Sequence, residues 1–70
     1  MKYDKITARQ SFDPTNGTTL QFSTVAEATA WVEREMQDHR LATYSIYRNS
    51  TNRLLRQWEL GNLTIDRASK

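Results

Sequence analysis

Polar and apolar residues alternate along the first part of the chain, as they do in a strand with one buried face. Between residues 3 and 12, Ile6, Ala8 and Phe12 share one parity and polar side chains fill the other. Residues 13–17 favour a tight turn, because Pro14 presets φ and Gly17 accepts a positive φ. Alternation then resumes over residues 18–23, so residues 3–23 predict an antiparallel hairpin.

The period changes to that of a helix after residue 23. Thr24 and Glu27 have the spacing of a capping box, in which the Thr side chain accepts from the amide three residues on. The apolar side chains that follow form one stripe at helical spacing: Val25, Ala28, Val32 and Met36, with Trp31 at its flank. We therefore predict a helix that starts at Thr24 and ends near His39.

The last third of the chain is rich in strand-forming residues. Residues 41–48 and 53–60 each alternate, and the polar residues 49–52 between them predict a second hairpin. By parity, Tyr44 and Trp58 should point under the helix. The tail from Asn62 has one apolar pair, so a short edge strand and a frayed end both fit it, and we expect residues 67–70 to be frayed.

The order of elements predicts a single small α+β domain over residues 1–70. Its architecture is a four-stranded antiparallel sheet of two hairpins with one helix packed on one face (ββαββ). One helix leaves the opposite sheet face uncovered. We expect the uncovered face to carry these side chains: Lys5, Thr7, Arg9, Thr19, Gln21, Thr43, Ser45, Tyr47, Arg53, Leu55, Gln57 and Glu59.

Length and charge change this picture in two ways. A chain of 70 residues and 8.2 kDa buries only about 60% of its surface on folding, so self-association or a partner would matter to its stability. The net charge of +2 is unevenly spread. Residues 1–39 hold four basic and six acidic residues, whereas residues 40–70 hold six basic and two acidic ones. The basic excess lies in the last part of the chain and is mostly arginine.

Several kinds of chemistry lack the residues they need. The chain has no cysteine and one histidine, His39, so we expect no metal site, no cofactor and no thiol chemistry. Glu33, Glu35 and Asp38 spread over the polar side of the predicted helix, where a solvated face explains them. We predict a protein that is not an enzyme. No apolar run has the length of a membrane span, and we expect a cytoplasmic protein without membrane contact.

The remaining candidate is a surface on the second hairpin, where aromatic, arginine and aliphatic side chains gather. These residue types are enriched at interface anchors. We therefore expect a non-catalytic protein-binding module, a small adaptor or inhibitor that docks its open sheet face or an edge strand on a larger protein. The ββαββ layout, shared by many small bacterial and phage proteins, does not itself fix a function. The predicted partner-binding residues are Tyr47, Arg48, Arg53, Leu55 and Arg56.

Two other interpretations stay open. The arginines of the second hairpin, together with Arg67, could contact phosphates while Tyr47 stacks on a base, which would make the chain a weak nucleic-acid-binding domain. Alternatively, an unpaired edge strand could join two copies of the chain into a dimer.

Overall fold

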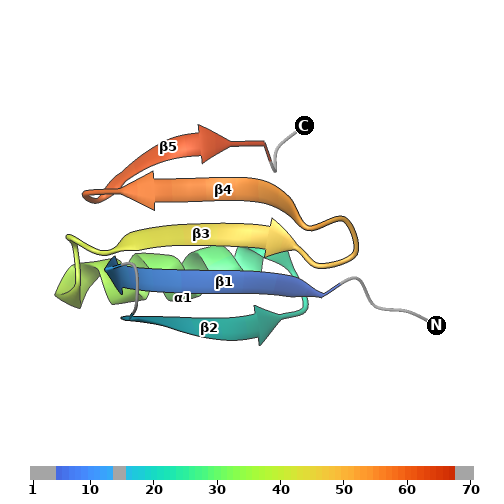
Figure 1. Cartoon of the computed structure of the whole chain (residues 1–70), viewed down its shortest axis with the longest axis horizontal. Coiled ribbons are helices and arrows are strands. Elements are labelled where there is room, and N and C mark those ends of the chain that lie inside the picture. Colours follow the sequence, from blue (N-terminus) through green and yellow to red (C-terminus); the bar gives the residue numbers. More distant parts are fainter. Residues whose placement is uncertain (1–4, 14–15, 68–70) are drawn as a thin grey trace.

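The computed structural model describes residues 5–13 and 16–67, which form one sheet and one helix (Figure 1). The strands pair antiparallel throughout, in the spatial order β2-β1-β3-β4-β5. The elements in chain order are β1 (Ile6–Asp13), β2 (Asn16–Phe22), α1 (Val25–Asp38), β3 (Thr43–Arg48), β4 (Arg53–Glu59) and β5 (Asn62–Asp66). The α+β class is confirmed. Residues 1–4, 14–15 and 68–70, which include part of the predicted first turn and most of the predicted frayed end, lie outside the described residues.

The prediction of a four-stranded sheet is wrong, because the tail supplies a fifth strand. Glu59 pairs with Asn62, and the two residues between them, Leu60 (φ 54°) and Gly61 (φ 83°), both have positive φ. Positive φ at both central positions is the geometry of a type I′ turn, whose twist matches that of a hairpin. The turn therefore folds β5 back onto β4. Beyond β5, Arg67 donates its backbone N–H to Leu55 O at 2.7 Å.

The helix begins and ends where the sequence predicts. The Thr24 hydroxyl accepts from Glu27 N at 3.1 Å, and the Glu27 carboxylate accepts from Ser23 N at 3.1 Å, so the glutamate reaches one residue farther back than a standard capping box requires. His39 caps the other end by donating its N–H to Glu35 O. The helix packs on β1, β2 and β3, and Figure 1 shows β4 and β5 extending beyond it.

The core lies between α1 and the sheet. Its buried members are Ile6, Ala8, Ala28, Val32, Ala42, Tyr44, Ile46, Leu55 and Trp58. The prediction that Tyr44 and Trp58 point under the helix is confirmed. A buried glutamine also lies in this layer: Gln10 Nε2 donates to Tyr44 Oη at 2.9 Å and to Glu35 Oε1 at 3.3 Å. Tyr44 Oη in turn donates to His39 O at 2.9 Å, which ties β1 and β3 to the end of the helix.

A β-bulge in β4 changes which leucine faces the core. Ile46 pairs with Arg56, but the next residue, Tyr47, pairs with Leu54, so Leu55 is the extra residue of the ladder. Residues directly opposite each other lie on the same face of a sheet, which places Leu54 with Tyr47 on the uncovered side. Leu55 is only 4% exposed and belongs to the core. The prediction that Leu55 lies exposed on the open face is therefore wrong.

Candidate protein-docking face

The sheet face opposite α1, which we call the open face, is lined by alternate residues of every strand. Strand register assigns its side chains, because those opposite one another share a face with Tyr47. Figure 1 looks directly onto this face, with α1 behind the sheet. The open face consists of Thr19 and Gln21 on β2, Thr7, Arg9 and Ser11 on β1, Thr43, Ser45 and Tyr47 on β3, Leu54, Gln57 and Glu59 on β4, and Ile65 on β5.

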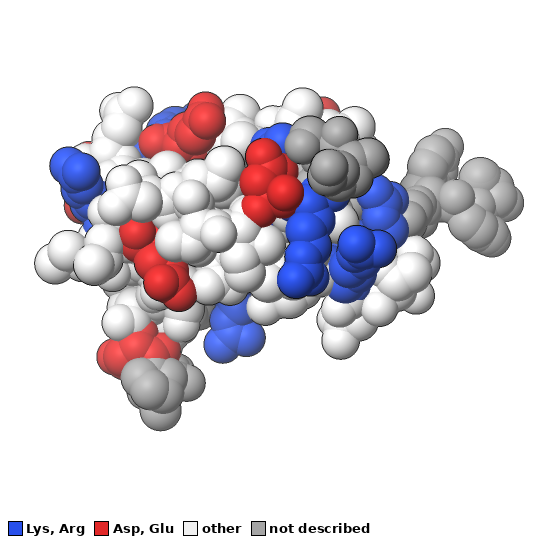
Figure 2. Space-filling model, turned by 90° about the horizontal axis from the view of Figure 1, so that it is seen from above, with Lys and Arg blue, Asp and Glu red and all other residues white. Residues whose placement is uncertain are grey.

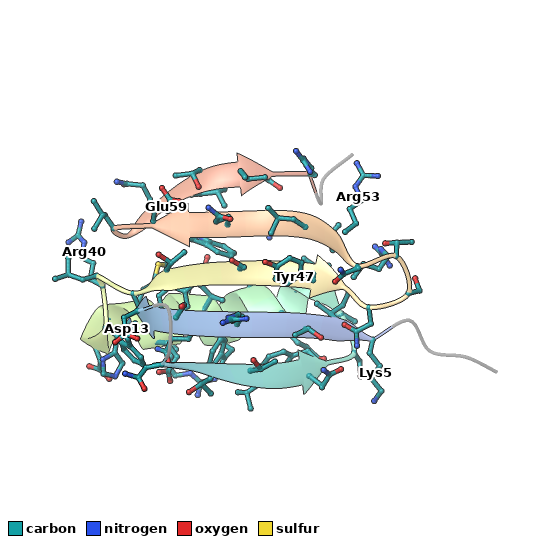
Figure 3. All side chains as sticks on the ribbon, viewed as in Figure 1. Lys5, Asp13, Arg40, Tyr47, Arg53 and Glu59 are labelled. Atoms are coloured by element: carbon teal, nitrogen blue, oxygen red, sulfur yellow. The ribbon has the colours of Figure 1, made fainter. Side chains whose placement is uncertain are left out.

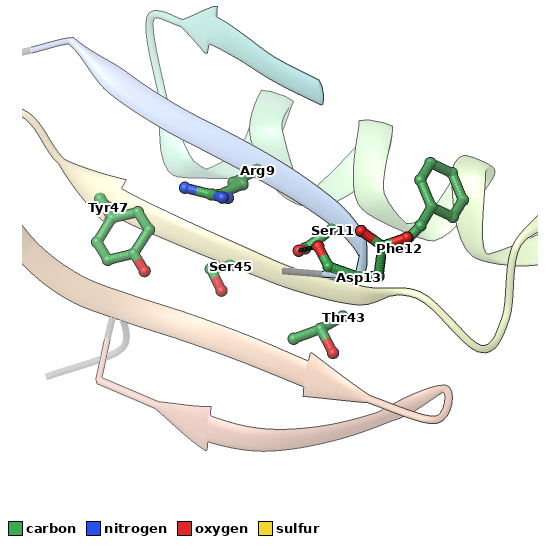
Figure 4. A pocket seen from close by; sticks show the side chains of 7 residues that line it. All are labelled: Arg9, Ser11, Phe12, Asp13, Thr43, Ser45 and Tyr47. Carbon is green, nitrogen blue, oxygen red and sulfur yellow. Dashed lines mark hydrogen bonds between the residues drawn. The ribbon is translucent and has the colours of Figure 1, made fainter. Parts of the chain in front are cut away.

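Arg9 lies on β1 and Tyr47 on β3, two adjacent interior strands of the open face. Arg9 pairs across the ladder with Ser45, and Tyr47 pairs with Thr7, so the two long side chains are diagonal neighbours. Figure 4 shows both rising from the sheet on the same side. Among the described residues, Arg9 makes no hydrogen bond or ion pair. An exposed, unpaired guanidinium beside a tyrosine is the kind of group that anchors a partner.

Small hydroxyl side chains leave a depression beside Arg9 and Tyr47. It has a volume of about 410 Å³ and extends toward the end of β1, where Phe12 and Asp13 belong to its lining. Ser45 forms its floor and is only 8% exposed, although no helix covers it. Ser11 Oγ donates to Asp13 O at 3.2 Å, which fixes one wall. The depression therefore presents the hydroxyl groups of Ser45, Ser11 and Thr43 beside Arg9 and Tyr47.

Toward the other end of β1, three polar side chains form a closed ring of hydrogen bonds. Gln21 Nε2 donates to Thr7 Oγ1 at 2.9 Å, and Asn49 Nδ2 donates to Gln21 Oε1 at 2.8 Å. Thr7 Oγ1 completes the ring by donating to Asn49 Oδ1. The ring joins β2, β1 and the β3–β4 turn, and it holds this part of the open face in one conformation.

The second-hairpin residues that the sequence grouped together are separated by the structure. Tyr47 lies on the open face as expected. Arg48 pairs with Arg53, one position beyond the Tyr47–Leu54 pair. Because side chains alternate between the two faces, both arginines point to the opposite side from Tyr47. The expectation that Tyr47 and Arg53 share the open face is wrong, because the bulge at Leu55 shifts the parity of the residues that precede it in β4.

Arg56 holds three elements together instead of facing outward. Its Nε donates to Asp66 Oδ1 at 3.1 Å, and its NH1 group donates to Thr29 Oγ1 at 2.9 Å. The ion pair with Asp66 links β4 to β5, and the bond to Thr29 links β4 to α1. Because β4 lies beyond the strands on which α1 packs, this arginine helps to dock the outer strands. Its role as a partner-binding residue stays untested.

The two ends of the sheet carry different charged side chains. Lys5 and Arg53 lie at the end that holds the β3–β4 turn, while Asp13 and Glu59 lie at the opposite end with Arg40 (Figure 3). Figure 2 shows the same trend from above, with most basic side chains in view toward the β3–β4 turn. Arg48 and Arg67 add to the basic end, because Arg48 pairs with Arg53 and Arg67 lies beside Leu55. The sheet therefore has a basic end at the β3–β4 turn and a mixed end with Asp13, Glu59 and Arg40, although Arg48 and Arg53 point away from the open face.

The described part of the chain brings together no group of three or more His, Asp or Glu side chains that could hold a metal ion. The single histidine lies at the helix end, where its ring meets the Phe12 ring edge to face, with centroids 5.3 Å apart. Burial raises the pKa of Tyr44, and the nearby Glu35 and Asp38 carboxylates add to this rise, although the bond from Gln10 opposes it. These groups hold the helix end on the sheet, beside a shallow cavity of about 250 Å³ that Phe12, Asp38, His39 and Arg40 help to line.

Arg9 is not among the partner-binding residues that the sequence predicts. The sequence places Arg9 on the open face but favours the arginines of the second hairpin, because they are more numerous there. The feature that distinguishes Arg9 is its position: it lies on β1, an interior strand between β2 and β3. That position follows only from the pairing of β1 with β3.

No protein-family model matches this sequence, and comparison with curated proteins and with solved structures finds no similar protein. Among the described residues, no helix has the length and apolar character needed to cross a membrane. Inferences about function therefore rest on the geometry described above.

Proposed function

We propose that this chain is a non-catalytic protein-binding module, an adaptor or inhibitor that docks its open face on a larger protein. The observation that carries the proposal is the uncovered sheet face with Arg9 and Tyr47 as diagonal neighbours on β1 and β3, two adjacent interior strands. Arginine and tyrosine dominate interface hot spots, and such residues concentrate near the centre of an interface. The flanking Ser, Thr and Gln side chains would then form the polar surroundings of the two anchors.

The chemistry of the open face defines the partner. Arg9 needs a carboxylate that it can contact through two nitrogens, and Tyr47 needs an apolar cradle for its ring with a polar group at its tip. Hydroxyls at Ser11, Thr43 and Ser45 would bond backbone or side-chain groups that enter the depression. The partner is therefore an acidic protein surface with a protruding loop or edge of a few residues. We place the interaction in the cytoplasm.

The decisive experiment compares two variants of this 70-residue chain with the wild type. A protein that co-purifies with the wild type is identified, purified and titrated with wild type, with the Arg9→Ala/Tyr47→Ala double variant and with Arg53→Ala. We expect the double variant to lose more than about 2 kcal/mol, a roughly 30-fold weaker Kd, because it removes both anchors. Arg53→Ala should bind as the wild type does, because its side chain points to the opposite side from Tyr47. Equal affinities of the double variant and the wild type would remove the open face from the proposal.

Nucleic-acid binding is the alternative outcome. The structure turns Arg48 and Arg53 away from Tyr47, so base stacking and phosphate contacts by these residues would occur on different faces. Fluorescence anisotropy of labelled single- and double-stranded oligonucleotides across a salt series tests this alternative. Each phosphate contact adds about 0.9 to the log–log salt slope on a duplex and about 0.7 on a single strand. Micromolar binding with a steep slope would replace the protein-binding proposal, whereas flat anisotropy at low salt would agree with it.

A further inference from the structure

The two edges of the sheet differ in how they are protected against pairing with another strand. β5 is five residues long and ends in Asp66, and its ladder with β4 shifts register between Gln57 and Trp58. Short length, charge and bulges are features that prevent edge-to-edge association. β2 is less protected, since the one irregularity in its ladder with β1 lies at its Asn16 end. It is seven residues long, contains no charged residue or proline, and pairs with β1 without a shift from Phe22 to Gly17.

An apolar strip runs along β2 on the side of the helix. Leu20 pairs with Ala8 and Phe22 pairs with Ile6, which places both side chains on the core side of the sheet. Leu20 is nevertheless 39% exposed, because β2 is the last strand. The Phe22 and Trp31 rings lie 6.0 Å apart, and both are only partly buried. The strip therefore ends at an open strand edge, where an added strand would cover it.

We propose that β2 pairs antiparallel with β2 of a second copy of this chain, about a two-fold axis near Thr19. Full overlap of Asn16–Phe22 with itself places Thr19 opposite Thr19 and Thr18 opposite Leu20. Because β2 carries no charge, this self-pairing brings no like charges together, which is the usual obstacle to a strand meeting its own copy. The two Leu20 side chains then lie on the same face as diagonal neighbours, and each copy covers the apolar strip of the other.

The choice of a second copy over an extended peptide follows from this self-complementarity. An isologous interface needs one surface that matches itself after a two-fold rotation. In a dimer, both copies present the same uncharged strand and the same exposed Leu20, so each meets that condition. A peptide partner would have to supply the apolar residues itself. Pairing makes one continuous sheet with both helices on one side, and it gives a small core additional buried apolar surface.

The test is a charge-swap series followed by sedimentation velocity over a range of concentrations. We expect the wild type to shift from the 8.2 kDa of one chain toward twice that mass as its concentration rises. Thr19→Glu and Thr19→Lys should each raise the dimer Kd at least about tenfold, because each places like charges opposite one another at the axis. An equimolar mixture of the two variants should dimerise again, since Glu then faces Lys. This rescue cannot come from variants that fail to fold.

Thr64→Glu on the other edge is the matched control, and it should dimerise as the wild type does. Three results would overturn the proposal: a wild type that stays monomeric up to about 1 mM, loss of the dimer in Thr64→Glu, or an unchanged dimer in Thr19→Glu. If the wild type is monomeric, an extended segment of another protein becomes the candidate partner for the β2 edge. None of these results affects the open-face proposal, because its test uses Arg9 and Tyr47 and reads affinity for a partner.

Discussion

The β4 bulge makes two neighbouring leucines differ in their contribution to stability. Leu55 is 4% exposed inside the core, whereas Leu54 is half-buried and faces the open side opposite Tyr47. We therefore expect Leu55→Ala to lower the free energy of unfolding by about 2–5 kcal/mol, the range for a leucine removed from a packed core. Leu54→Ala should cost about 1 kcal/mol or less, because much of its surface already contacts water.

These losses are large on the scale of this domain. A chain of this length has a total stability of roughly 4–10 kcal/mol, so Leu55→Ala removes between a fifth of it and all of it. One kcal/mol corresponds to about 4–8 °C in Tm for a domain of this size, which predicts a fall of roughly 10 °C or more. Leu54→Ala should move Tm by less than about 8 °C.

Urea titration followed by circular dichroism measures both variants, with thermal melts as a second readout. The m-value should stay constant, so that the shift in midpoint reports stability alone. Plain alternation along β4 predicts the reverse order, with Leu54 in the core and Leu55 exposed. A larger loss for Leu54→Ala than for Leu55→Ala would therefore refute the bulge and the face assignments that depend on it.

Two further predictions concern the turn and the buried tyrosine. In the β4–β5 turn, Leu60→Asn should stabilise the domain by about 0.5–1 kcal/mol, because asparagine tolerates the left-handed region. Gly61→Ala should destabilise it by about 1–2 kcal/mol. Urea midpoints measure both changes, and an unchanged stability of Gly61→Ala would contradict the turn geometry. Tyr44→Phe should cost about 1–3 kcal/mol at neutral pH, because Gln10 and His39 O lose a buried partner. The pKa of Tyr44 is raised above 10.0 in the folded state, so its neutral form is favoured there, and the stability linked to it is present below pH 10 and lost as pH rises through the folded value. Urea midpoints from pH 8 to 11 should therefore fall less steeply for Tyr44→Phe than for the wild type, and parallel curves would exclude this linkage.

Local sequence signals predicted the elements whose residues contact one another within a hairpin or a helix. The helix was fully specified by Thr24, Glu27 and the apolar stripe that ends near His39. The four-residue connection between β3 and β4 was equally clear, because four polar residues interrupt two alternating segments. Within these elements, the side facing the core was also correct for Tyr44 and Trp58.

The fifth strand and the bulge escaped prediction for physical reasons. A type I′ turn is usually signalled by Asn-Gly or Gly-Gly, and here Leu60 occupies a position that leucine seldom adopts. The bulge leaves no mark in the sequence, since Leu54 and Leu55 are identical and either could face inward. One extra residue reversed the parity of Arg53, and that single shift removed Arg53 from the face that Tyr47 occupies. The position of Arg9 beside Tyr47 was not predicted, because it depends on the long-range pairing of β1 with β3.

The pairing of β1 with β3 also bears on how the chain folds. In the described part of the chain, every other strand pair joins neighbours in sequence, whereas β1 meets β3 across β2 and the helix, with Ile6 paired to Arg48 and Ser11 to Thr43. The molecule thus consists of two locally assembled halves, β1–β2–α1 and β3–β4–β5, joined along one seam. Pairing β1 with β3 closes the longest loop between paired strands of the described chain, so we expect this step to slow folding most. It also marks the segment between α1 and β3 as the place where two separately made fragments could reassemble into the native sheet.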